Sequence, residues 1–274
     1  MKLWAIADLH LRYPANRAAV SGLVARPEDW LIVAGDVGES LEQMRWAWQE
    51  LGSRFARLFW VPGNHELWSA SGDPLSGDFR YRALVDLCRE YGVVTPEDPF
   101  VAWPGQPTPE GGRFRIAPLF LLYDYTFRPD DVPPERAVAW AMEHEVLCSD
   151  EMLLRPDPFP DRAAWCAARC DEAERRLSAE LAPGDRLILV NHWPLLQEHA
   201  RLPLVPRFMV WCGTRRTALW HRRFPTEVVV YGHLHIPQSQ ELDGVRFEEV
   251  SLGYPKNWEG RRRPEEALRL ILGE

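Results

Sequence analysis

Five short apolar runs, each followed within three residues by a polar residue, place the strongest limit on what this chain can fold into. Each run is rich in β-branched or aromatic residues, and together they cover residues 3–7, 30–34, 57–61, 186–190 and 228–231. Nearly continuous apolar runs of this length are typical of strands that are covered on both faces. Helical spacing at 41–51 and 79–91 falls between neighbouring runs. The pattern therefore predicts an α/β fold in which these runs are the central strands.

Two other segments bear on the architecture. Residues 238–250 alternate around Asp243-Gly244, a dipeptide that favours a type I′ hairpin turn, and they predict a second, partly antiparallel sheet. From about 128 to 183, Pro-rich edges flank two charged, Ala-rich helical stretches at 134–152 and 161–181. We interpret this part as a helical insertion in a single domain that spans 1–274. Its pattern fits a cover over a substrate pocket and helices packed for stability alone equally well.

Composition limits the expected partners. With 46% hydrophobic and 26% charged residues, the chain resembles ordinary soluble globular proteins. Its formal net charge of -8 argues against long nucleic acid as a partner, although a local cationic site could still hold one anionic group. The first apolar run leaves no room for a signal peptide, and no stretch of about eighteen uncharged apolar residues follows. We therefore expect a cytoplasmic protein without a membrane anchor; the oligomeric state is left open.

The residues that follow the five runs carry the chemistry. The run ends read AIADLH, LIVAGD, FWVPGNHE, LILVNH and VVYGHLH. In α/β sheets, strand ends on one side converge on a common crevice, so residues far apart in sequence meet there. A single histidine beside a strand end is usually a surface or packing residue, and only the recurrence at five ends favours a site. The residues expected to share this site are Asp8, His10, Asp36, Asn64, His65, His192, His233 and His235.

The residue types at these ends favour a dinuclear metal centre. Carboxylate, amide and imidazole groups without a thiolate suit two divalent ions of the Mn, Fe or Zn type. Asp8 and His10 are two apart in an extended segment, so their side chains can bind one ion together. His233 and His235 have the same spacing and can serve the pair of ions. Asp36 carries the carboxylate best suited to bridge both ions.

The order of these motifs resembles that of the calcineurin-like metallophosphoesterase superfamily. Its pattern D-x-H, G-D, G-N-H-[DE], H and G-H-x-H occurs here in that order, and SLGYP at 251–255 is similar to a later segment of the family. The resemblance implies a two-sheet β-sandwich flanked by helices. It also implies that His65 binds no metal and protonates the leaving group. The implied ligand sets are Asp8, His10, Asp36 and His235 for one ion, and Asp36, Asn64, His192 and His233 for the other.

The sequence departs from one branch of this superfamily. The phosphoprotein phosphatases carry G-D-x-x-D-R-G, whereas this chain reads GDVGESL, with Glu39 and Ser40 in place of the Asp and the Arg. Membership of that branch is therefore not expected. Glu39 or Glu66 could orient the His65 imidazole, and Glu66 fits a solvated helix-start residue equally well. Arg215 and Arg216 are candidates to clamp a phosphate or carboxylate of the substrate, although a solvated surface position is the simpler interpretation.

These features predict hydrolysis of a phosphoester. Two divalent ions would lower the pKa of a bridging water from about 16 toward about 7 and so supply a hydroxide nucleophile at neutral pH. The expected activity is that of a phosphatase or phosphodiesterase on a small phosphorylated substrate. The alternatives are a nuclease of the same superfamily, which the acidic composition disfavours, and a non-catalytic scaffold, which should have lost expected ligands.

Overall fold

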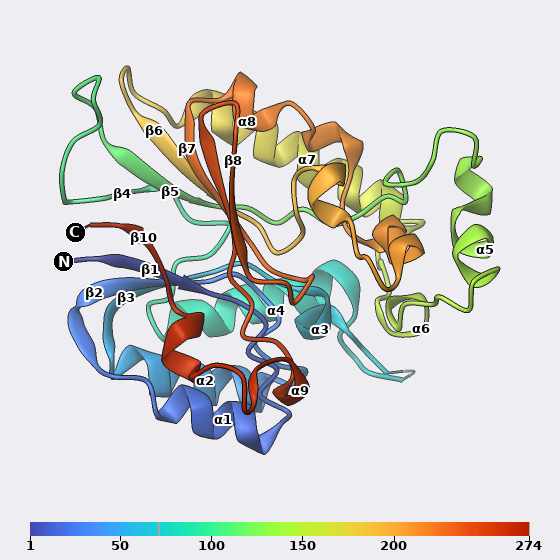
Figure 1. The fold of residues 1–274 in the computed structure, drawn as a ribbon, viewed down its shortest axis with the longest axis horizontal. Helices are drawn as coiled ribbons and strands as arrows, with labels where there is room; N and C mark the ends of the chain where they lie inside the picture. The colour runs from blue at the N-terminus through green and yellow to red at the C-terminus, as the bar shows by residue number, and fades with distance from the viewer. Residues whose placement is uncertain (71, 274) are drawn as a thin grey trace.

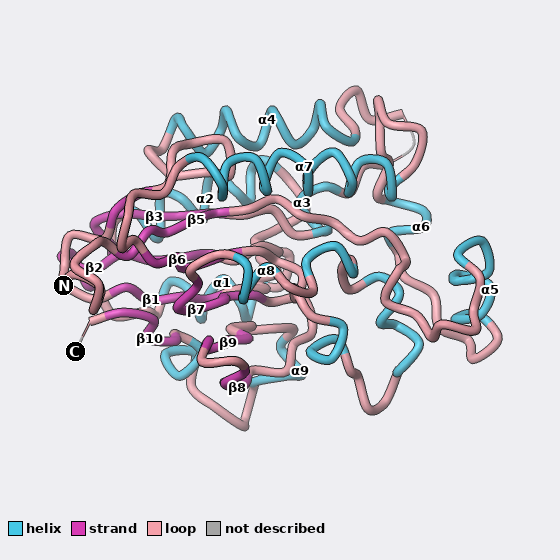
Figure 2. Tube along the Cα trace, turned by 90° about the horizontal axis from the view of Figure 1, so that it is seen from above, coloured by secondary structure: helices cyan, strands magenta, loops and turns pink. Residues whose placement is uncertain are grey.

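The computed structural model describes residues 1–70 and 72–273. Within these residues, strands form two sheets that pack face to face between helices (Figures 1 and 2). The first sheet has the order β10-β1-β2-β3 and the second the order β4-β5-β6-β7-β9-β8. The strands of the first sheet are β1 (Leu3–Ile6), β2 (Arg26–Val33), β3 (Phe55–Trp60) and β10 (Arg269–Leu272). Those of the second are β4 (Val101–Ala102), β5 (Phe114–Pro118), β6 (Arg186–Val190), β7 (Thr226–Tyr231), β8 (Gln238–Leu242) and β9 (Val245–Glu249).

Most neighbouring strands are parallel. Strands β1, β2 and β3 run in one direction, as do β5, β6, β7 and β9, and the edge strands β10, β4 and β8 are antiparallel to their neighbours. Beyond β1 and β9, an isolated parallel bridge between Ala7 and Ser251 joins the two sheets. The carboxyl ends of strands from both sheets therefore meet at one edge of the sandwich.

Helices cover both outer faces of the sandwich. In Figure 1, α1 and α2 lie against the first sheet, and α7 and α8 lie against the second. Figure 2 shows α4 beside α7, where the Arg169 guanidinium lies 5.2 Å from the Tyr81 ring centroid. The helices are α1 (Pro14–Ser21), α2 (Leu41–Gly52), α3 (Asn64–Leu67), α4 (Gly77–Glu90), α5 (Ala137–Met142), α6 (Asp150–Leu153), α7 (Arg162–Ala179), α8 (Trp220–Arg223) and α9 (Pro255–Trp258).

The period-two alternation of the strands divides the buried side chains between two layers. Ala5, Ile32 and Phe59 of the first sheet pack between the sheets against Ile188 and Val230 of the second. Residues that alternate with them along the same strands face the helices. Strands covered on both faces need apolar residues at nearly every position, which explains the continuous apolar runs.

The predicted α/β class, the two-sheet sandwich and all five central strands are confirmed. The predicted hairpin is also present: β8 and β9 are antiparallel, and Asp243 and Gly244 have φ of 52° and 76° at the turn. These positive values are those that a type I′ turn requires.

The region predicted as an insertion contains two short helices, α5 and α6, and one long helix, α7, which packs into the main core. The helical stretch expected over 134–152 is wrong as a continuous helix, because α5 ends at Met142 and α6 begins only at Asp150. Between them Glu145 has a φ of 58°, which ends helical backbone, and Asp150 turns into the protein interior. By contrast, α7 connects the parallel strands β5 and β6 and buries Trp165 in the main core. The limits of an insertion at 128–183 stay a prediction.

In the described residues, no helix combines the length and the apolar character needed to cross a membrane. The five cysteines are free thiols, and all are buried.

Candidate metal centre

The expected site residues follow the carboxyl ends of β1, β2, β3, β6 and β7, at the edge where the two sheets meet. Three groups of their side chains bring potential ligand atoms within 4.8 Å of one another. Six of the eight residues expected from the sequence belong to these groups; of the other two, His233 contacts Asp8 through its backbone N–H, and Asn64 contacts His233. The three groups are Asp8 with His10 and His235, His10 with Asp36 and His65, and Asp8 with Asp36 and His192.

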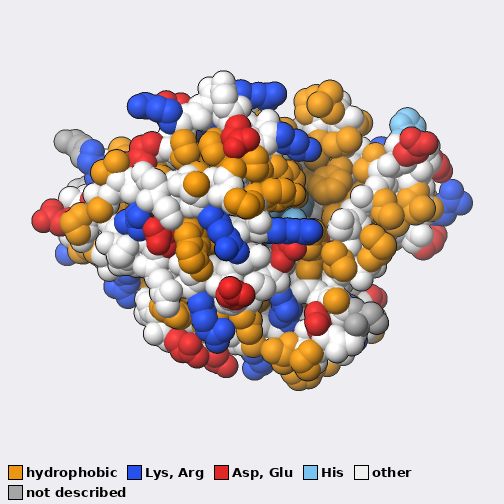
Figure 3. Space-filling view, turned by 90° about the horizontal axis from the view of Figure 1, so that it is seen from below, with side chains coloured by type: hydrophobic (Ala, Val, Ile, Leu, Met, Phe, Trp, Pro, Cys, Tyr) orange, Lys and Arg blue, Asp and Glu red, His pale blue; other side chains and the backbone are white. Residues whose placement is uncertain are grey.

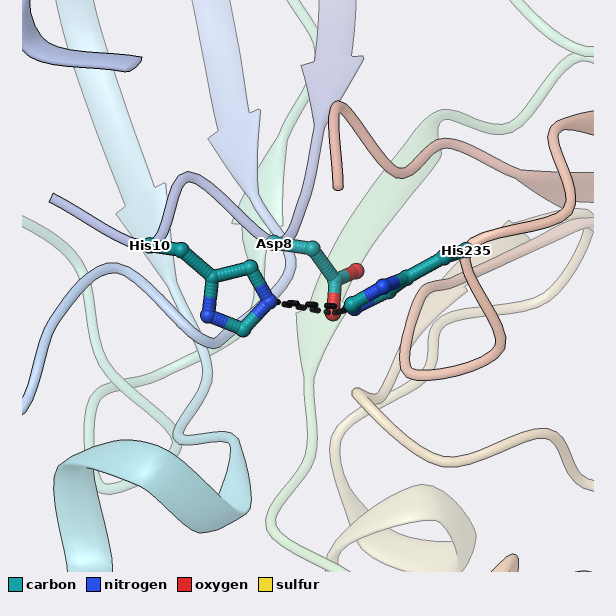
Figure 4. A group of neighbouring side chains, drawn as sticks. All are labelled: Asp8, His10 and His235. Atoms are coloured by element: carbon teal, nitrogen blue, oxygen red, sulfur yellow. Dashed lines mark hydrogen bonds and ion pairs between the residues drawn. The ribbon is translucent and has the colours of Figure 1, made fainter. Parts of the chain in front are cut away.

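One group is centred on Asp8 (Figure 4). Its Oδ1 lies 3.0 Å from Nε2 of His235 and 3.7 Å from Nε2 of His10. The two Nε2 atoms are themselves 3.0 Å apart. The carboxylate oxygen and both ring nitrogens thus converge on one point, which is the geometry expected of ligands to a single cation.

Asp36 lies at the centre of the cluster. Its Oδ2 is 4.0 Å from Nε2 of His10, 3.5 Å from Nε2 of His192 and 3.7 Å from Nε2 of His65. Its other oxygen accepts a hydrogen bond from the His65 backbone N–H at 2.9 Å, which fixes the carboxylate plane. One oxygen of Asp36 therefore faces imidazoles from both sheets.

Asn64 and His233 converge on the other side of the cluster. The Asn64 Oδ1 lies 3.2 Å from Nδ1 of His233. The Asn64 amide nitrogen donates to Oδ1 of Asp150 at 3.0 Å, and Trp68 Nε1 donates to the same oxygen at 2.7 Å. Because its nitrogen is held by Asp150, the Asn64 amide presents its oxygen to the cluster.

The backbone is strained where it carries the cluster. Positive φ occurs at Asp8 (56°), His10 (42°), Asp36 (54°), His233 (72°) and His235 (56°). Left-handed backbone at non-glycine residues costs roughly 1–3 kcal/mol each and gathers at functional sites. These conformations turn the side chains inward directly after the strands end.

Glycines next to the cluster permit close approach. A Cβ at Gly63 would collide with Oδ1 of Asp36, and a Cβ at Gly232 would collide with Oδ2 of Asp8. Both carboxylates therefore need glycine in these neighbouring segments, because no other residue leaves them room.

The protonation of the buried imidazoles fits a cation site. Burial lowers the pKa of His10 to about 3, and burial together with His192 lowers that of His233 to about 3, so both are neutral near pH 7 with a lone pair to offer. The Nδ1 of His192 lies 2.8 Å from the carbonyl oxygen of Ala34, which can only accept, so Nδ1 carries a proton. Its Nε2 is buried without a hydrogen-bond partner among the described residues.

The negative charge of Asp36 favours a cation beside the Nε2 atom of His192, which lies 3.5 Å from Asp36 Oδ2. Burial, the largest single influence, disfavours the charged form of His192, but the carboxylates of Asp36 and Asp8 together with the Ala34 carbonyl outweigh it and raise the pKa of His192 to about 10. The position between the two side chains therefore attracts a cation, whether a proton or a metal ion. The donor set, with buried oxygen and imidazole groups and no thiolate, fits divalent transition metals.

His65 lies at the edge of the cluster, where the pocket opens. Its Nδ1 is 3.4 Å from Oε1 of Glu39, and its Nε2 is 3.5 Å from the hydroxyl oxygen of Tyr254. Burial alone would lower the pKa of His65, but the carboxylates of Asp36 and Glu39 outweigh burial and raise it. Its ring centroid lies 3.7 Å from that of Trp68.

Glu66 does not contact the His65 imidazole, and it is not solvated. Its side chain is fully buried and accepts hydrogen bonds from the backbone N–H groups of Asp36 (3.0 Å), Val37 (2.9 Å) and Gly63 (3.1 Å). Burial and the nearby Asp36 raise the pKa of Glu66 to about 7. Glu66 therefore ties the segment after β2 to the segment after β3, and the expectation of a solvated helix-start residue is wrong.

The structure does not bring Arg215 and Arg216 to the cluster. Arg215 pairs with Asp130 at 2.6 Å, and Arg216 pairs with Asp171 at 2.5 Å. Both are on the surface, where solvent surrounds them and neighbouring acidic groups compensate their charge. Their contacts therefore favour a solvated surface position for both arginines over a role in clamping the substrate.

A cavity of about 420 Å³ opens over the cluster. The cluster contributes five residues to its lining: Asp36, Asn64, His65, His233 and His235. Figure 3 shows a hollow between the body of the molecule and the lobe that carries α5, with hydrophobic side chains on its walls. A larger hollow of about 1080 Å³ lies elsewhere, along 181–186, 221–226 and 243–245, and none of the expected site residues lines it.

Comparison with known proteins decides the family. The family model described as calcineurin-like phosphoesterase matches residues 1–237. The chain belongs to this family. Calcineurin-like phosphoesterases are metal-dependent enzymes with a dinuclear metal centre, and the cluster supplies candidate ligands for one. The chain is accordingly a metal-dependent phosphoric ester hydrolase.

One relative of this calcineurin-like phosphoesterase, PptH of Mycobacterium tuberculosis, is similar over nearly its whole length, both in sequence and in its crystal structure. The [acyl-carrier-protein] phosphodiesterase PptH of Mycobacterium tuberculosis (strain ATCC 25618 / H37Rv) is 48% identical over an alignment of 274 positions that covers 98% of this chain and 83% of the relative. The crystal structure of phosphopantetheinyl hydrolase (PptH) from Mycobacterium tuberculosis has a TM-score of 0.92 and 46% sequence identity, and covers 100% of this chain and 96% of that one.

Sequence reasoning missed the residues that support this phosphoesterase cluster from behind. Asp150, Ser251 and Glu249 are buried, and Ser251 Oγ lies 2.6 Å from Oδ2 of Asp8 and 2.5 Å from Oε1 of Glu249. Ser251 lies in the SLGYP segment, whose similarity to the family does not by itself indicate this contact. No local sequence pattern indicates the role of Asp150, because its partner Asn64 is 86 residues away along the chain.

Proposed function

We propose that this protein is a phosphodiesterase that cleaves the phosphodiester between a 4′-phosphopantetheine arm and a serine of an acyl carrier protein. The observation that carries the proposal is the 48% identity over 98% of the chain to the relative with this name. The substrate expected from the sequence was a small phosphorylated molecule, and the proposal replaces it with a phosphodiester held on a protein. Hydrolysis would release phosphopantetheine and leave the serine hydroxyl on the carrier.

The cluster supports this chemistry through its charges. Bound at the two sets of side chains, divalent ions of the Mn, Fe or Zn type would attract the phosphate oxygens and provide an activated water as nucleophile. Asp36 is the proposed shared ligand, because its Oδ2 faces both His10 and His192. Asp8 and His235 complete the His10 side, and the remaining proposed ligands are Asn64, His192 and His233.

His65 is the proposed general acid. It lines the pocket, and the Glu39 carboxylate 3.4 Å from its Nδ1 holds the imidazole so that Nε2 faces the cluster. A proton on Nε2 can pass to the serine oxygen as that oxygen leaves the phosphorus. The arrangement thus supports the proposal that His65 donates a proton to the leaving group as negative charge develops on its oxygen.

The nuclease alternative has less support. The pocket lies in a chain with a formal net charge of -8, and the two arginines considered as phosphate clamps are paired on the surface. A groove that binds the phosphate backbone of a nucleic acid needs a stripe of basic groups. The scaffold alternative is inconsistent with a relative that is a phosphodiesterase.

The test is direct hydrolysis. Metal-loaded protein is incubated with a phosphopantetheinylated acyl carrier protein, and intact mass measurements follow the carrier. The expected result is loss of the whole arm with its phosphate, and no loss with the Asp36→Asn variant. A carrier that keeps its arm, while a panel of phosphomonoesters is hydrolysed, would show that the enzyme is a phosphatase with another substrate.

A further inference from the structure

Part of the pocket is lined by apolar side chains, which take no part in the hydrolysis of a phosphodiester. Leu147, Leu202, Val205 and Phe208 line it, and they come from the turn between α5 and α6 and from the segment after β6. Leu147 and Val205 keep 48% and 43% of their surface exposed. Exposed apolar groups gathered at the mouth of a pocket mark a ligand-binding surface. We refer to these four residues as the apolar wall.

The apolar wall adjoins the metal cluster at His233. The Phe208 ring stacks 5.9 Å from the ring of His233, which follows β7 in the second sheet. The proposed proton donor His65 instead packs against Trp68, after β3 in the first sheet. The leaving oxygen must face His65, so the part of the substrate that stays on the phosphate has the wall beside it.

The helices between β5 and β6 brace this wall. The Arg207 guanidinium lies 4.4 Å from the Trp140 ring centroid in α5 and donates to the Trp140 carbonyl oxygen. Arg207 also pairs with Glu143 at 2.9 Å. Two segments distant in sequence are thus held together where Leu147 and Val205 reach the pocket.

The size and polarity of the pocket indicate which kind of ligand it can bind. A volume of about 420 Å³ suits a small molecule and excludes a folded protein. Of the described residues that line the pocket outside the cluster, Lys256 is the charged one, and its Nζ lies 5.7 Å from the ring centroid of Tyr254. The wall therefore offers apolar surface, with Ser149 beside it as a hydrogen-bonding group.

We propose that the apolar wall is the binding subsite for the pantetheine arm, and that the carrier protein itself remains outside the pocket. The inference rests on the function proposed above. The arm carries a gem-dimethyl group and methylene units between two amides, which match apolar side chains with a few hydrogen-bonding groups. The arm then enters the pocket with its phosphate on the cluster, and the serine lies at the mouth beside His65.

The test compares two ligands that share a phosphate monoester. Isothermal titration calorimetry measures the affinity of manganese-loaded protein for 4′-phosphopantetheine and for methyl phosphate. If the wall binds the arm, phosphopantetheine binds at least about 10-fold more tightly than methyl phosphate. In the Leu147→Asn/Val205→Asn variant, whose new amides bring no charge, this ratio is expected to fall to near one. Equal affinities for the two ligands in the unaltered protein would overturn the inference.

Leu204→Asn is the matched control. Leu204 is a neighbour of Val205 and is 94% exposed, but it does not line the pocket. The control is expected to keep the full ratio, and a loss equal to that of the double variant would also overturn the inference. Cleavage of the phosphopantetheinylated carrier is assayed separately. If the unaltered protein binds the arm but leaves the carrier intact, the proposed function fails and the subsite stands.

Discussion

The side chain of Asp150 holds the amide of Asn64, with 3.0 Å between Asn64 Nδ2 and Asp150 Oδ1. This hydrogen bond connects the start of α6 to the segment after β3 and leaves the Asn64 oxygen 3.2 Å from His233 Nδ1. Burial raises the pKa of Asp150, which has no exposed surface, and the donors Asn64 and Trp68 oppose that shift. A residue outside the five strand ends therefore decides which atom of Asn64 faces the proposed metal centre.

Replacing Asp150 with Ala should weaken metal binding on the Asn64 side. Without its acceptor the amide can rotate, and loss of a group that orients a ligand typically costs about 10- to 100-fold in metal affinity. Metal titration followed by elemental analysis after dialysis measures the loss. Asp161→Ala is the control, because Asp161 caps α7 by accepting from Ala164 N–H and contributes nothing to the cluster. Full metal content in the Asp150 variant would contradict the orienting role.

Ser251 should play the same part for Asp8. Its Oγ lies within hydrogen-bond distance of Asp8 (2.6 Å) and of Glu249 (2.5 Å), so one hydroxyl hydrogen serves two carboxyl groups. Ser251→Ala removes this contact and should lower metal affinity on the Asp8 side roughly 10-fold. Glu249→Gln keeps groups that can bond to Ser251 and should have a smaller effect. Titration with Mn²⁺ followed by electron paramagnetic resonance measures both affinities.

Ser239→Ala provides the comparison for that experiment. Its hydroxyl also bonds a glutamate, Glu248, at 3.0 Å, but on β8 and away from Asp8. A similar change in Mn²⁺ affinity in the Ser239 and Ser251 variants would mean that Ser251 has no specific effect on the centre.

The central strands could be predicted because their information is local. An apolar run such as 186–190, followed by His192, shows both the strand and the polar group at its end, and parallel sheets gather such ends at one edge. The contact between Asp150 and Asn64 could not be predicted in this way. It depends on an irregular segment between α5 and α6 whose path is set by tertiary packing, and period-based reasoning expected a continuous helix there.

Glu66 shows a second limit of sequence reasoning. A glutamate directly after His65 at the start of a helix has the spacing of a capping residue, and such residues are usually solvated. Here two segments from neighbouring strands approach each other, and their buried N–H groups need an acceptor. Only the packing of the segment after β2 against the segment after β3 reveals that Glu66 supplies it.

The central position of Asp36 predicts different metal losses in two variants. Asp36→Asn should weaken both ions, because a neutral amide bridges poorly, whereas Asp8→Asn should mainly affect the ion near His10 and His235. Elemental analysis of protein purified without chelator should find about two transition-metal ions per chain in the unaltered protein. Loss of the same single ion in both variants would exclude a bridging role for Asp36.

The last prediction separates a metal ligand from a proton donor at His65, whose sequence neighbour Asn64 points its oxygen at the cluster. If His65 only donates a proton, His65→Ala should keep about two metal ions yet lose roughly 10² to 10⁴ in rate on an alkyl phosphodiester, whose alkoxide is a poor leaving group. The loss should be much smaller on a nitrophenyl phosphodiester, because nitrophenolate departs without protonation. His192→Ala, which removes a proposed ligand, should lose metal and fail on both substrates. Metal loss in His65→Ala, or equal loss of rate on both diesters, would show that His65 is not the general acid.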